Sequence, residues 1–458
     1  MTHESTKMAR LKGPASVRAV VTCAIVALAV IVIAVVMIKP WAGPVNPPDW
    51  TPGLPTMSEL PKNLPVPIAA PALPGAKAYG GSYDDEFSGV AVGQDGSVVA
   101  AGYTQSSDGD FPQRFSWSNS ATMIMAHPDG RAWAQVYGGG GGDKFRAVAA
   151  ESDGSVIVAG ESWSELGDFP QADGGYALVA KINSDGTLAW ATRFGSNTDR
   201  DGLSDVAVGA DGRIVVAGYV DSYNGNLGCV GKGWCGILAE VTAGGDQVWQ
   251  KTYPNGRSFS AIAMTADGNI VAVGSDESDT CPTTDYYCSS VMMTDPAGNV
   301  LWTKILDESG WETLNGISVA PDGSIVAVGA VGSSAIAVKL TADGQVEWSN
   351  MFLPDQSGKF DAVAVNSDGG IVAVGQASEY SSNSRGGLVA LISPSGELTW
   401  SKTFGISGDT EFTCVATSPN QIVVGGNTTS PDGAFANTHG TNNKDAVLMR
   451  LTPDGQLS

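Results

Sequence analysis

The chain has 458 residues and 43% of them are apolar, which allows a large buried core and excludes global disorder. It contains 59 glycines and only 16% charged residues, a profile of many short strands joined by tight turns rather than of a helical protein. The net charge is −22, and because the first 18 residues carry +3, the remainder carries −25. Such an acidic chain repels phosphate backbones, so nucleic acid is excluded as an expected partner.

The first predicted element is an uninterrupted apolar run over residues 19–38. A helix of this length spans roughly 30 Å, the thickness of a bilayer core. The length of the run and the lack of a good cleavage site after it favour an uncleaved signal anchor over a cleaved signal peptide. Because basic residues precede the run, we expect a single-pass protein of the cell membrane, with residues 1–18 in the cytoplasm and the rest of the chain outside.

Residues 39–75 form the next predicted region and contain 11 prolines. Proline at this density excludes helices and central strands. In a polyproline II conformation, at about 3.1 Å per residue, the region would reach roughly 110 Å. We interpret it as a stalk between the membrane and the following domain, and the alternative is an irregular coil packed on that domain.

From residue 76 onward the chain is built of repeats. An apolar segment ending in glycine occurs seven times, at residues 97–102, 155–160, 213–218, 269–274, 324–329, 370–375 and 421–426. Six of the seven segments follow an Asp-Gly pair, which predicts hairpins with type I′ turns, and the last follows Pro419-Asn420. Each segment has another apolar strand before it and a third after a variable loop. Each unit is therefore a predicted four-stranded antiparallel sheet, and such sheets must stack to bury both faces.

The fourth strand of each unit carries a tryptophan, but only six such strands are present: Trp133, Trp190, Trp249, Trp302, Trp348 and Trp400. Residues 76–81 align with 134–139, so we expect the N-terminal segment to supply the outer strand of the last unit. Residues 76–458 are thus predicted to form an all-β, seven-bladed, monomeric β-propeller closed by an N-terminal strand. A parallel β-helix is the rival architecture, but its rungs are shorter and usually lack hairpins.

The repeats resemble a known group of bacterial sequences. The pattern Val-Ala-Val-x-x-Asp-Gly-x-Ile-Val-Val-Ala-Gly is similar to Delta-60-type repeats, and Asp110-Phe111-Pro112 and Asp168-Phe169-Pro170 resemble the Asp-Phe-Pro of SBBP-type β-propeller repeats. The resemblance covers residues 76–458 and implies a secreted or cell-surface propeller without a defined activity. Blades 4 and 5 depart from it, with Arg257 and Trp311 where an aspartate is expected.

Two pairs of cysteines lie in equivalent loops of blades 3 and 4. Cys229 and Cys235 form the first pair, and Cys281 and Cys288 the second. Short spacing in an extracytoplasmic chain predicts a disulfide in each loop. The remaining cysteine of the domain, Cys414, occupies a position held by small residues in other blades, so we expect it to be buried and inert.

Acidic residues recur just before the first strands. An acidic ring around the central funnel is predicted from Asp85, Asp143, Asp201 and Glu312, with Asp205 as a further carboxylate near the channel. No cofactor is expected, although Ca²⁺ is conceivable at Asp84, Asp85, Asp110 and Asp168, because oxygen ligands suit it. The competing interpretation is that each aspartate caps its own turn, while Phe111 and Phe169 hold their loops onto the blades.

The loops after the second strands and the loops between blades share one face of a propeller. These loops vary in length, and blade 5 has only residues 330–334 there, which predicts a notch above that blade. We therefore expect an interaction module that binds an extracellular protein or a glycan through this face. Only His127 and His439 are available outside for proton transfer, so no catalytic triad is recognisable. The alternatives are a carbohydrate-active enzyme with a carboxylate pair in the funnel, and a spacer without a specific ligand.

Overall fold

The computed structural model describes residues 66–67, 75–111, 118–165, 167–169, 175–195, 201–221, 229, 234–254, 257–276, 288–306, 312–353, 356–379, 384–436, 438–439 and 443–458. The predicted cytoplasmic tail and the apolar run 19–38 lie outside these residues, as does most of the predicted stalk. Within the described part, no helix is both long and apolar enough to cross a bilayer.

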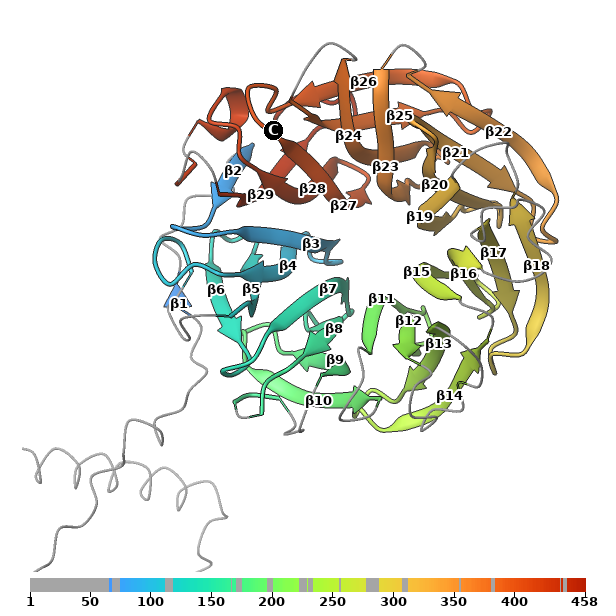
Figure 1. Ribbon diagram of the computed structural model, residues 1–458, viewed down its shortest axis with the longest axis horizontal. Coiled ribbons are helices and arrows are strands. Elements are labelled where there is room, and N and C mark those ends of the chain that lie inside the picture. Colours follow the sequence, from blue (N-terminus) through green and yellow to red (C-terminus); the bar gives the residue numbers. More distant parts are fainter. Residues whose placement is uncertain are drawn as a thin grey trace, which may run out of the picture. The chain divides into compact units, whose positions relative to one another are not determined.

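The described residues form a ring of seven four-stranded antiparallel sheets around a central channel, which confirms the predicted propeller (Figure 1). In each blade the first strand lies at the channel and the last at the rim. The first three blades comprise β3 (Asp85–Val92), β4 (Val98–Thr104), β5 (Ser120–Ala126) and β6 (Ala132–Tyr137); β7 (Asp143–Ala150), β8 (Val156–Ser162), β9 (Tyr176–Ile182) and β10 (Leu188–Phe194); and β11 (Gly202–Val208), β12 (Ile214–Asp221), β13 (Trp234–Val241) and β14 (Gln247–Tyr253).

Blades 4 to 6 comprise β15 (Ser258–Met264), β16 (Ile270–Asp276), β17 (Cys288–Thr294) and β18 (Val300–Leu306); β19 (Glu312–Val319), β20 (Ile325–Val331), β21 (Ser334–Leu340) and β22 (Val346–Phe352); and β23 (Gln356–Val365), β24 (Ile371–Glu379), β25 (Gly386–Ile392) and β26 (Leu398–Phe404). Blade 7 comprises β27 (Thr410–Ser418), β28 (Gln421–Thr428), β29 (Asp445–Leu451) and β2 (Ala76–Tyr79). A short 3₁₀ helix, η2 (Gly433–Phe435), precedes β29.

The N-terminal strand closes the ring as predicted. β2 pairs antiparallel with β29, with Ala76 opposite Met449 and Tyr79 opposite Ala446. Across the same junction, the Thr413 hydroxyl donates to the carbonyl of Phe87 at 2.7 Å. A further short strand, β1 (Val66–Pro67), pairs with the outer edge of β6 and gives blade 1 a fifth strand. The region predicted as a stalk therefore contains a strand attached to the propeller.

The Asp-Gly turns differ from the predicted type I′ geometry. In the first, the Gly96 N–H donates to the Gly93 carbonyl at 2.9 Å, and the Gly93 N–H donates to the Ser97 carbonyl at 2.8 Å. Gly96 has a φ of 83°, while Asp95 is not among the positive-φ residues of the described chain. This is a three-residue loop in which only the glycine is left-handed, and the Asp95 carboxylate accepts the Ser97 N–H at 2.9 Å. The type I′ prediction was wrong, because a type I′ turn needs a positive φ at both central residues and only the glycine has one here.

Aromatic pairs fill the space between neighbouring blades. A ring at the end of one outer strand packs on a ring in the next inner strand, as in Tyr137–Phe145, with centroids 5.6 Å apart. Phe169 packs on the other side of Phe145 at 6.0 Å, and Phe111 packs on Phe87 at 6.2 Å. Both Asp-Phe-Pro loops are therefore held to their blades by the phenylalanine, as the sequence predicted.

The rim tryptophans join each blade to the next. The Trp190 indole N–H donates to the Ala243 carbonyl in the following blade at 2.9 Å, and Trp133, Trp302 and Trp348 make the equivalent bond. The rings lie against the turn glycine of that blade, so that a Cβ added to Gly245 would lie 2.6 Å from Trp190. We call this arrangement the Trp clamp. Trp249 and Trp400 also rest on a turn glycine of the next blade. However, the Trp249 indole N–H donates to Glu240 in its own blade, and Trp400 Nε1 has no hydrogen-bond partner among the described residues.

The cysteine predictions are met where the structure describes them. Cys229 and Cys235 form a disulfide, with their Cα atoms 5.8 Å apart. Cys288 begins β17 and is disulfide-bonded, while its predicted partner Cys281 lies outside the described residues. Cys414 is a buried free thiol, and burial raises its pKa to about 12, so it is unreactive at neutral pH.

Candidate functional site

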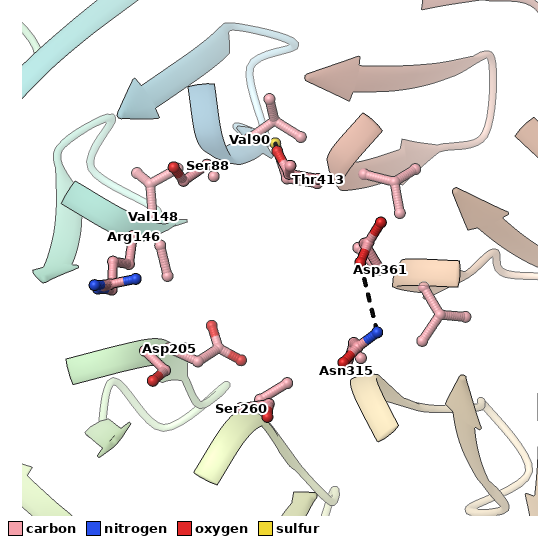
Figure 2. A pocket seen from close by; sticks show the side chains of 18 of the residues that line it. Ser88, Val90, Arg146, Val148, Asp205, Ser260, Asn315, Asp361 and Thr413 are labelled. Atoms are coloured by element: carbon pink, nitrogen blue, oxygen red, sulfur yellow. Dashed lines mark hydrogen bonds between the residues drawn. The ribbon is translucent and has the colours of Figure 1, made fainter. Parts of the chain in front are cut away.

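Each of the seven inner strands is interrupted by a register shift at the same place. The shift follows the buried Phe or Leu of the strand, for example between Phe87 and Gly89 in β3. A β-bulge leaves one residue unpaired and redirects its side chain. The seven residues at the shift line the central channel and all are polar: Ser88, Arg146, Ser204, Ser260, Asn315, Asp361 and Thr413. Figure 2 shows these side chains around the central space and labels all of them except Ser204.

The channel encloses a cavity of about 490 Å³. The residue after each bulge also lines it, and in six blades that residue is Gly, Ala or Cys. A small residue is required there because adjacent inner strands nearly touch, and a Cβ added to Gly89 would lie 2.8 Å from the Val148 nitrogen. Blade 3 alone has a large residue at this position, Asp205.

Asp205 links blades 3 and 4 through its carboxylate. One oxygen accepts the N–H of Val206 at 2.8 Å, and the other accepts the N–H of Ile262 in β15 at 2.8 Å. Burial raises the pKa of Asp205 to about 7, and these two hydrogen bonds oppose the rise only in part. The sequence analysis left two interpretations of Asp205 open, a hydrogen-bonded structural residue and a functional carboxylate. Its position in the cavity wall is compatible with both interpretations.

A second carboxyl group, Asp361, lines the opposite part of the wall. Its Oδ1 lies 2.8 Å from the Lys359 ammonium, and that ammonium also lies 2.6 Å from Glu411 in blade 7. The Asn315 amide donates to the Phe360 carbonyl at 2.9 Å and approaches Asp361 Oδ1 at 3.5 Å. Burial raises the pKa of Asp361 to about 6, against the effect of Lys359. On this side of the channel one ammonium is therefore shared by two carboxylates, and Asp361 Oδ2 is buried without a hydrogen bond among the described residues.

Aromatic and charged side chains gather over blades 1 to 3 where the inner strands begin, at the end of the ring that carries the loops between blades. We call this group the mouth cluster: Tyr103, Lys144, Arg146, Glu161, Tyr219 and Trp234. Lys144 lies over the Tyr103 ring, 4.4 Å from its centre, and Arg146 is 3.0 Å from Glu161. Tyr219 meets Trp234 edge to face, with centroids 5.1 Å apart. The first contact joins blades 1 and 2, the second lies within blade 2 and the third within blade 3.

A glycine shapes this side of the mouth. Gly202 pairs with Tyr219, and a Cβ at residue 202 would lie 2.8 Å from the tyrosine ring. Other blades have larger residues at this position, such as Glu86 and Lys359. Gly202 therefore leaves the room in which the Tyr219 ring lies across the strand beside Arg146. Burial raises the pKa of Tyr219, so its hydroxyl stays neutral.

Blades 4 and 5 have small side chains at the equivalent positions. Ser258 pairs with Ser275, their hydroxyls being 2.7 Å apart, and Thr313 pairs with Ala330. The hairpin after β20 is also short, because β20 ends at Val331 and β21 begins at Ser334. The mouth is thus asymmetric, with bulky aromatic and charged groups over blades 1 to 3 and small polar ones over blades 4 and 5.

The predicted acidic ring lies elsewhere. Asp85 is buried inside blade 1, where its carboxylate accepts the Gly81 N–H at 3.0 Å and the Ser106 hydroxyl at 2.8 Å. Asp143 makes the matching bonds to Gly139 and Ser164, and Asp201 accepts the N–H of Asp221. None of these three aspartates lines the central cavity. Among the described side chains of the predicted acidic ring and its neighbour Asp205, Asp205 is the one that does. They cap turns because the polar turn atoms beside them need partners, and the Glu312 side chain lies outside the described residues.

The predicted calcium ligands are bonded to protein donors. Asp84 accepts the Lys444 N–H at 2.9 Å, and Asp168 accepts the Gly138 N–H at 3.1 Å. Asp110 lies 2.9 Å from the Lys77 ammonium and 3.5 Å from the His439 ring. In the part of the chain that the structure describes, no group of three or more His, Cys, Asp or Glu could hold a metal ion. Nothing in this geometry favours Ca²⁺.

Sequence reasoning missed the bulge residues and the mouth cluster. A signal was present, since every inner strand reads buried Phe or Leu, then a polar residue, then in six blades a small one, as in Phe87-Ser88-Gly89. Alternation alone would send the middle residue into the blade-to-blade packing, and only the bulge turns it toward the channel. The acidic residues attracted attention because of their charge, but they satisfy local turns.

Comparison with known proteins agrees with this architecture. The family model described as "Domain of unknown function (DUF5122) beta-propeller" matches residues 209–228. The chain is a β-propeller repeat protein. No curated protein matches it in sequence. Among solved structures, virginiamycin B lyase from Staphylococcus aureus is 12% identical with a TM-score of 0.50, over 82% of this chain and 98% of that one.

The WD40 β-propeller domain of Doa1 is also 12% identical, with a TM-score of 0.49, over 82% of this chain and 97% of that one. At such low identity the structural likeness shows the fold alone.

Proposed function

We propose that the propeller is a binding module that holds a protein or glycan ligand at the channel mouth, on the end of the ring that carries the mouth cluster. One observation carries this proposal: equivalent positions around the mouth hold unlike side chains on a scaffold whose packing positions repeat. Blade 2 presents Lys144 and Arg146 there, while blade 4 presents Ser258 and Ser260. A rigid frame with one variable, asymmetric, partly aromatic surface is the usual form of a recognition site.

We also propose that the module works outside the cell membrane, held there by residues 19–38. The apolar run, the basic residues before it and the disulfide between Cys229 and Cys235 support this placement. Treating intact cells with an impermeant amine-reactive label tests it. Labelling of propeller lysines on intact cells supports the outside location, and labelling only after lysis contradicts it.

A carbohydrate-active enzyme is the second candidate function, with Asp205 and Asp361 as its candidate catalytic pair. Both line the same cavity, and burial raises both pKa values, to about 7 and about 6. A pair of carboxyl groups poised near neutral pH can act as general acid and base. If Asp205→Asn and Asp361→Asn each abolish glycan hydrolysis while the fold persists, the enzyme hypothesis stands, and unchanged turnover in both variants removes it.

The binding proposal is tested by locating the ligand contact. The full-length protein is screened against a glycan array and a set of purified envelope proteins, and each hit is measured again with the double variant Tyr219→Ala/Trp234→Ala. Loss of a large aromatic contact should weaken binding about tenfold or more. Leu301→Ala, at an exposed rim position of β18, is the matched control. Hits weakened only by the rim variant would place the ligand elsewhere and contradict the proposal.

A further inference from the structure

We infer that the ligand of the channel mouth is an uncharged oligosaccharide whose end enters the central cavity. The inference rests on the proposed function and narrows it to one ligand class. Its arguments are the volume of the cavity, the hydrogen-bonding capacity of its wall, the internal pairing of its charges and the aromatic rings at its entrance.

The size of the cavity fits a small molecule. A space of about 490 Å³ falls within the range of roughly 300 to 1,000 Å³ that small-ligand sites occupy. A folded protein domain cannot enter it, whereas a flexible chain of sugar rings can place its terminal units there. The mouth cluster then contacts the part of the ligand that stays outside the cavity.

The wall offers hydroxyl and amide groups with unused capacity. Among the described residues, the Ser204 and Ser260 hydroxyls make no hydrogen bond, and both side chains line the cavity. The Asn315 amide donates from its nitrogen, and no described residue donates to its oxygen. A hydroxyl group both donates and accepts, so a ring of Ser, Thr and Asn side chains matches a ligand made largely of hydroxyl groups.

The charged groups of the wall have partners, although Arg146 Nε and Asp361 Oδ2 are buried without a hydrogen bond among the described residues. Glu86, which also lines the cavity, accepts hydrogen bonds from Ser88 and Asn427. Arg146 pairs with Glu161, Lys359 pairs with Asp361 and Glu411, and the Asp205 carboxylate accepts two backbone N–H groups. An anionic ligand would have to give up its hydration without gaining an unpaired cationic group, which is unfavourable. The net charge of −22 adds repulsion against polyanions. A neutral ligand meets neither penalty.

The entrance presents aromatic side chains. Tyr103, Tyr219 and Trp234 are half-buried at the loop-bearing end of blades 1 and 3, outside the set of residues that line the cavity, and each has an apolar ring and a polar group. Two further aromatics are exposed at the loop-bearing end of blades 1 and 2: Tyr83, before β3, is 57% exposed, and Trp163, after β8, is 42% exposed. Flat apolar faces beside polar edges suit sugar rings, which have an apolar face and a polar rim.

The test is isothermal titration of the full-length protein with three uncharged hexasaccharides: cellohexaose, maltohexaose and N-acetylchitohexaose. Hexagalacturonate is the charged comparator. We expect one neutral sugar to bind, with a Kd that changes less than about twofold between 50 and 500 mM NaCl, since no net charge is involved. Tyr219→Ala/Trp234→Ala should weaken it about tenfold or more. Tyr219→Phe keeps the aromatic ring, so its Kd should stay within about threefold of that of the parent protein. Leu301→Ala should leave the Kd unchanged.

The outcomes separate this inference from the proposed function. If no neutral sugar binds but an envelope protein does, and the mouth variant weakens it, the inference fails and the binding module stands. If only hexagalacturonate binds, or binding collapses at high salt, the ligand is ionic and the inference also fails. If a neutral sugar binds equally to the mouth variant and the parent protein, the sugar lies elsewhere and both proposals fail. If the double variant does not fold, Ser260→Ala supplies the test, because it removes a hydroxyl of the cavity wall. Unchanged sugar binding in that variant would contradict the entry of the sugar into the cavity.

Discussion

Phe145 and Arg146 are neighbours in β7, yet one belongs to the interface between blades and the other to the channel wall. These two regions differ in how far the same residue type recurs from blade to blade. Phe145 is fully buried between blades 1 and 2, and Phe or Leu recurs at its position in every inner strand. Arg146 lies at the bulge and lines the channel, where each blade contributes its own polar residue. The blade interfaces repeat because each must fill the same space, whereas the channel wall varies because its side chains face an open cavity.

The rim extends the comparison. At the rim, Trp190 donates to the next blade and rests on Gly245, and equivalent clamps recur around the ring. The junction between blades 7 and 1 has no clamp tryptophan, since β2 contains none, and Gly130 in the next turn has open space beside it. Polar bonds such as that between Thr413 and Phe87 hold this junction instead. A change at a repeated position should therefore affect stability, and a change in the channel should affect recognition.

The largest effect is expected at the blade interface. Phe145→Ala removes a fully buried ring that packs on Tyr137 and Phe169, and should lower the free energy of unfolding by about 3 to 5 kcal/mol. Phe145→Leu should cost much less, because Leu203 and Leu314 occupy the same position in other blades. Denaturant unfolding measures both. An equal loss of unfolding free energy in the two variants would contradict the idea that this position requires only a large apolar side chain.

A smaller loss is expected at the rim. Trp190 is half-buried, so Trp190→Ala should cost about 2 kcal/mol, from lost packing on Gly245 and a lost hydrogen bond to Ala243. Trp190→Phe, which keeps an aromatic ring, should recover part of the loss. Thermal unfolding compares the three proteins. A Trp190→Ala variant as stable as the parent would show that the clamp does not hold the blades together.

The pH dependence of stability separates the channel from the turns. Burial raises the pKa of Asp205 to about 7 in the folded state, above its ordinary value of 3.8, so ionisation is disfavoured there. Its contribution to stability is fully present below about pH 4 and is lost as pH rises toward 7. The free energy of unfolding should therefore decline between pH 5 and pH 8, and Asp205→Asn should remove about 1 to 2 kcal/mol of this decline. The value allows for screening by solvent in the channel.

Asp95 provides the opposite case for that experiment. Hydrogen bonds from Ser97 lower its pKa, so its contribution is present above the unfolded pKa and is lost only as pH falls toward the folded value. Asp95→Asn should leave the slope between pH 5 and 8 unchanged. The measurement is the melting temperature of the parent protein and both variants at pH 5 and pH 8. A melting temperature of the parent protein that does not change between these pH values would contradict a raised pKa at Asp205.

The smallest effect on stability is expected in the channel wall. Ser260→Ala removes a hydroxyl that makes no hydrogen bond among the described residues, so the free energy of unfolding should change by less than about 0.5 kcal/mol. Ligand binding should nevertheless weaken. A clear loss of stability in Ser260→Ala would mean that this position belongs to the structural region.

The sequence by itself determined the ring. Seven Asp-Gly or equivalent hairpins, six rim tryptophans and the match between residues 76–81 and 134–139 were enough to predict the blade count and the closing strand, because these features depend on local turns and repeated apolar patterns. The disulfide between Cys229 and Cys235 was also predicted, from the short spacing of the two cysteines in a chain expected to lie outside the cytoplasm. The exception among local features was the turn type, in which only the glycine has a positive φ.

Only the tertiary structure decided which polar residues face the channel. Asp85 and Arg146 are both polar residues of inner strands, yet Asp85 points into its own blade and Arg146 lines the cavity. Arg146 is the bulge residue of β7, whereas Asp85 lies before the bulge of β3. Tyr219 reaches the mouth because Gly202 leaves space for its ring. Such placements depend on one-residue register shifts and on contacts between distant segments, which no alternation pattern specifies.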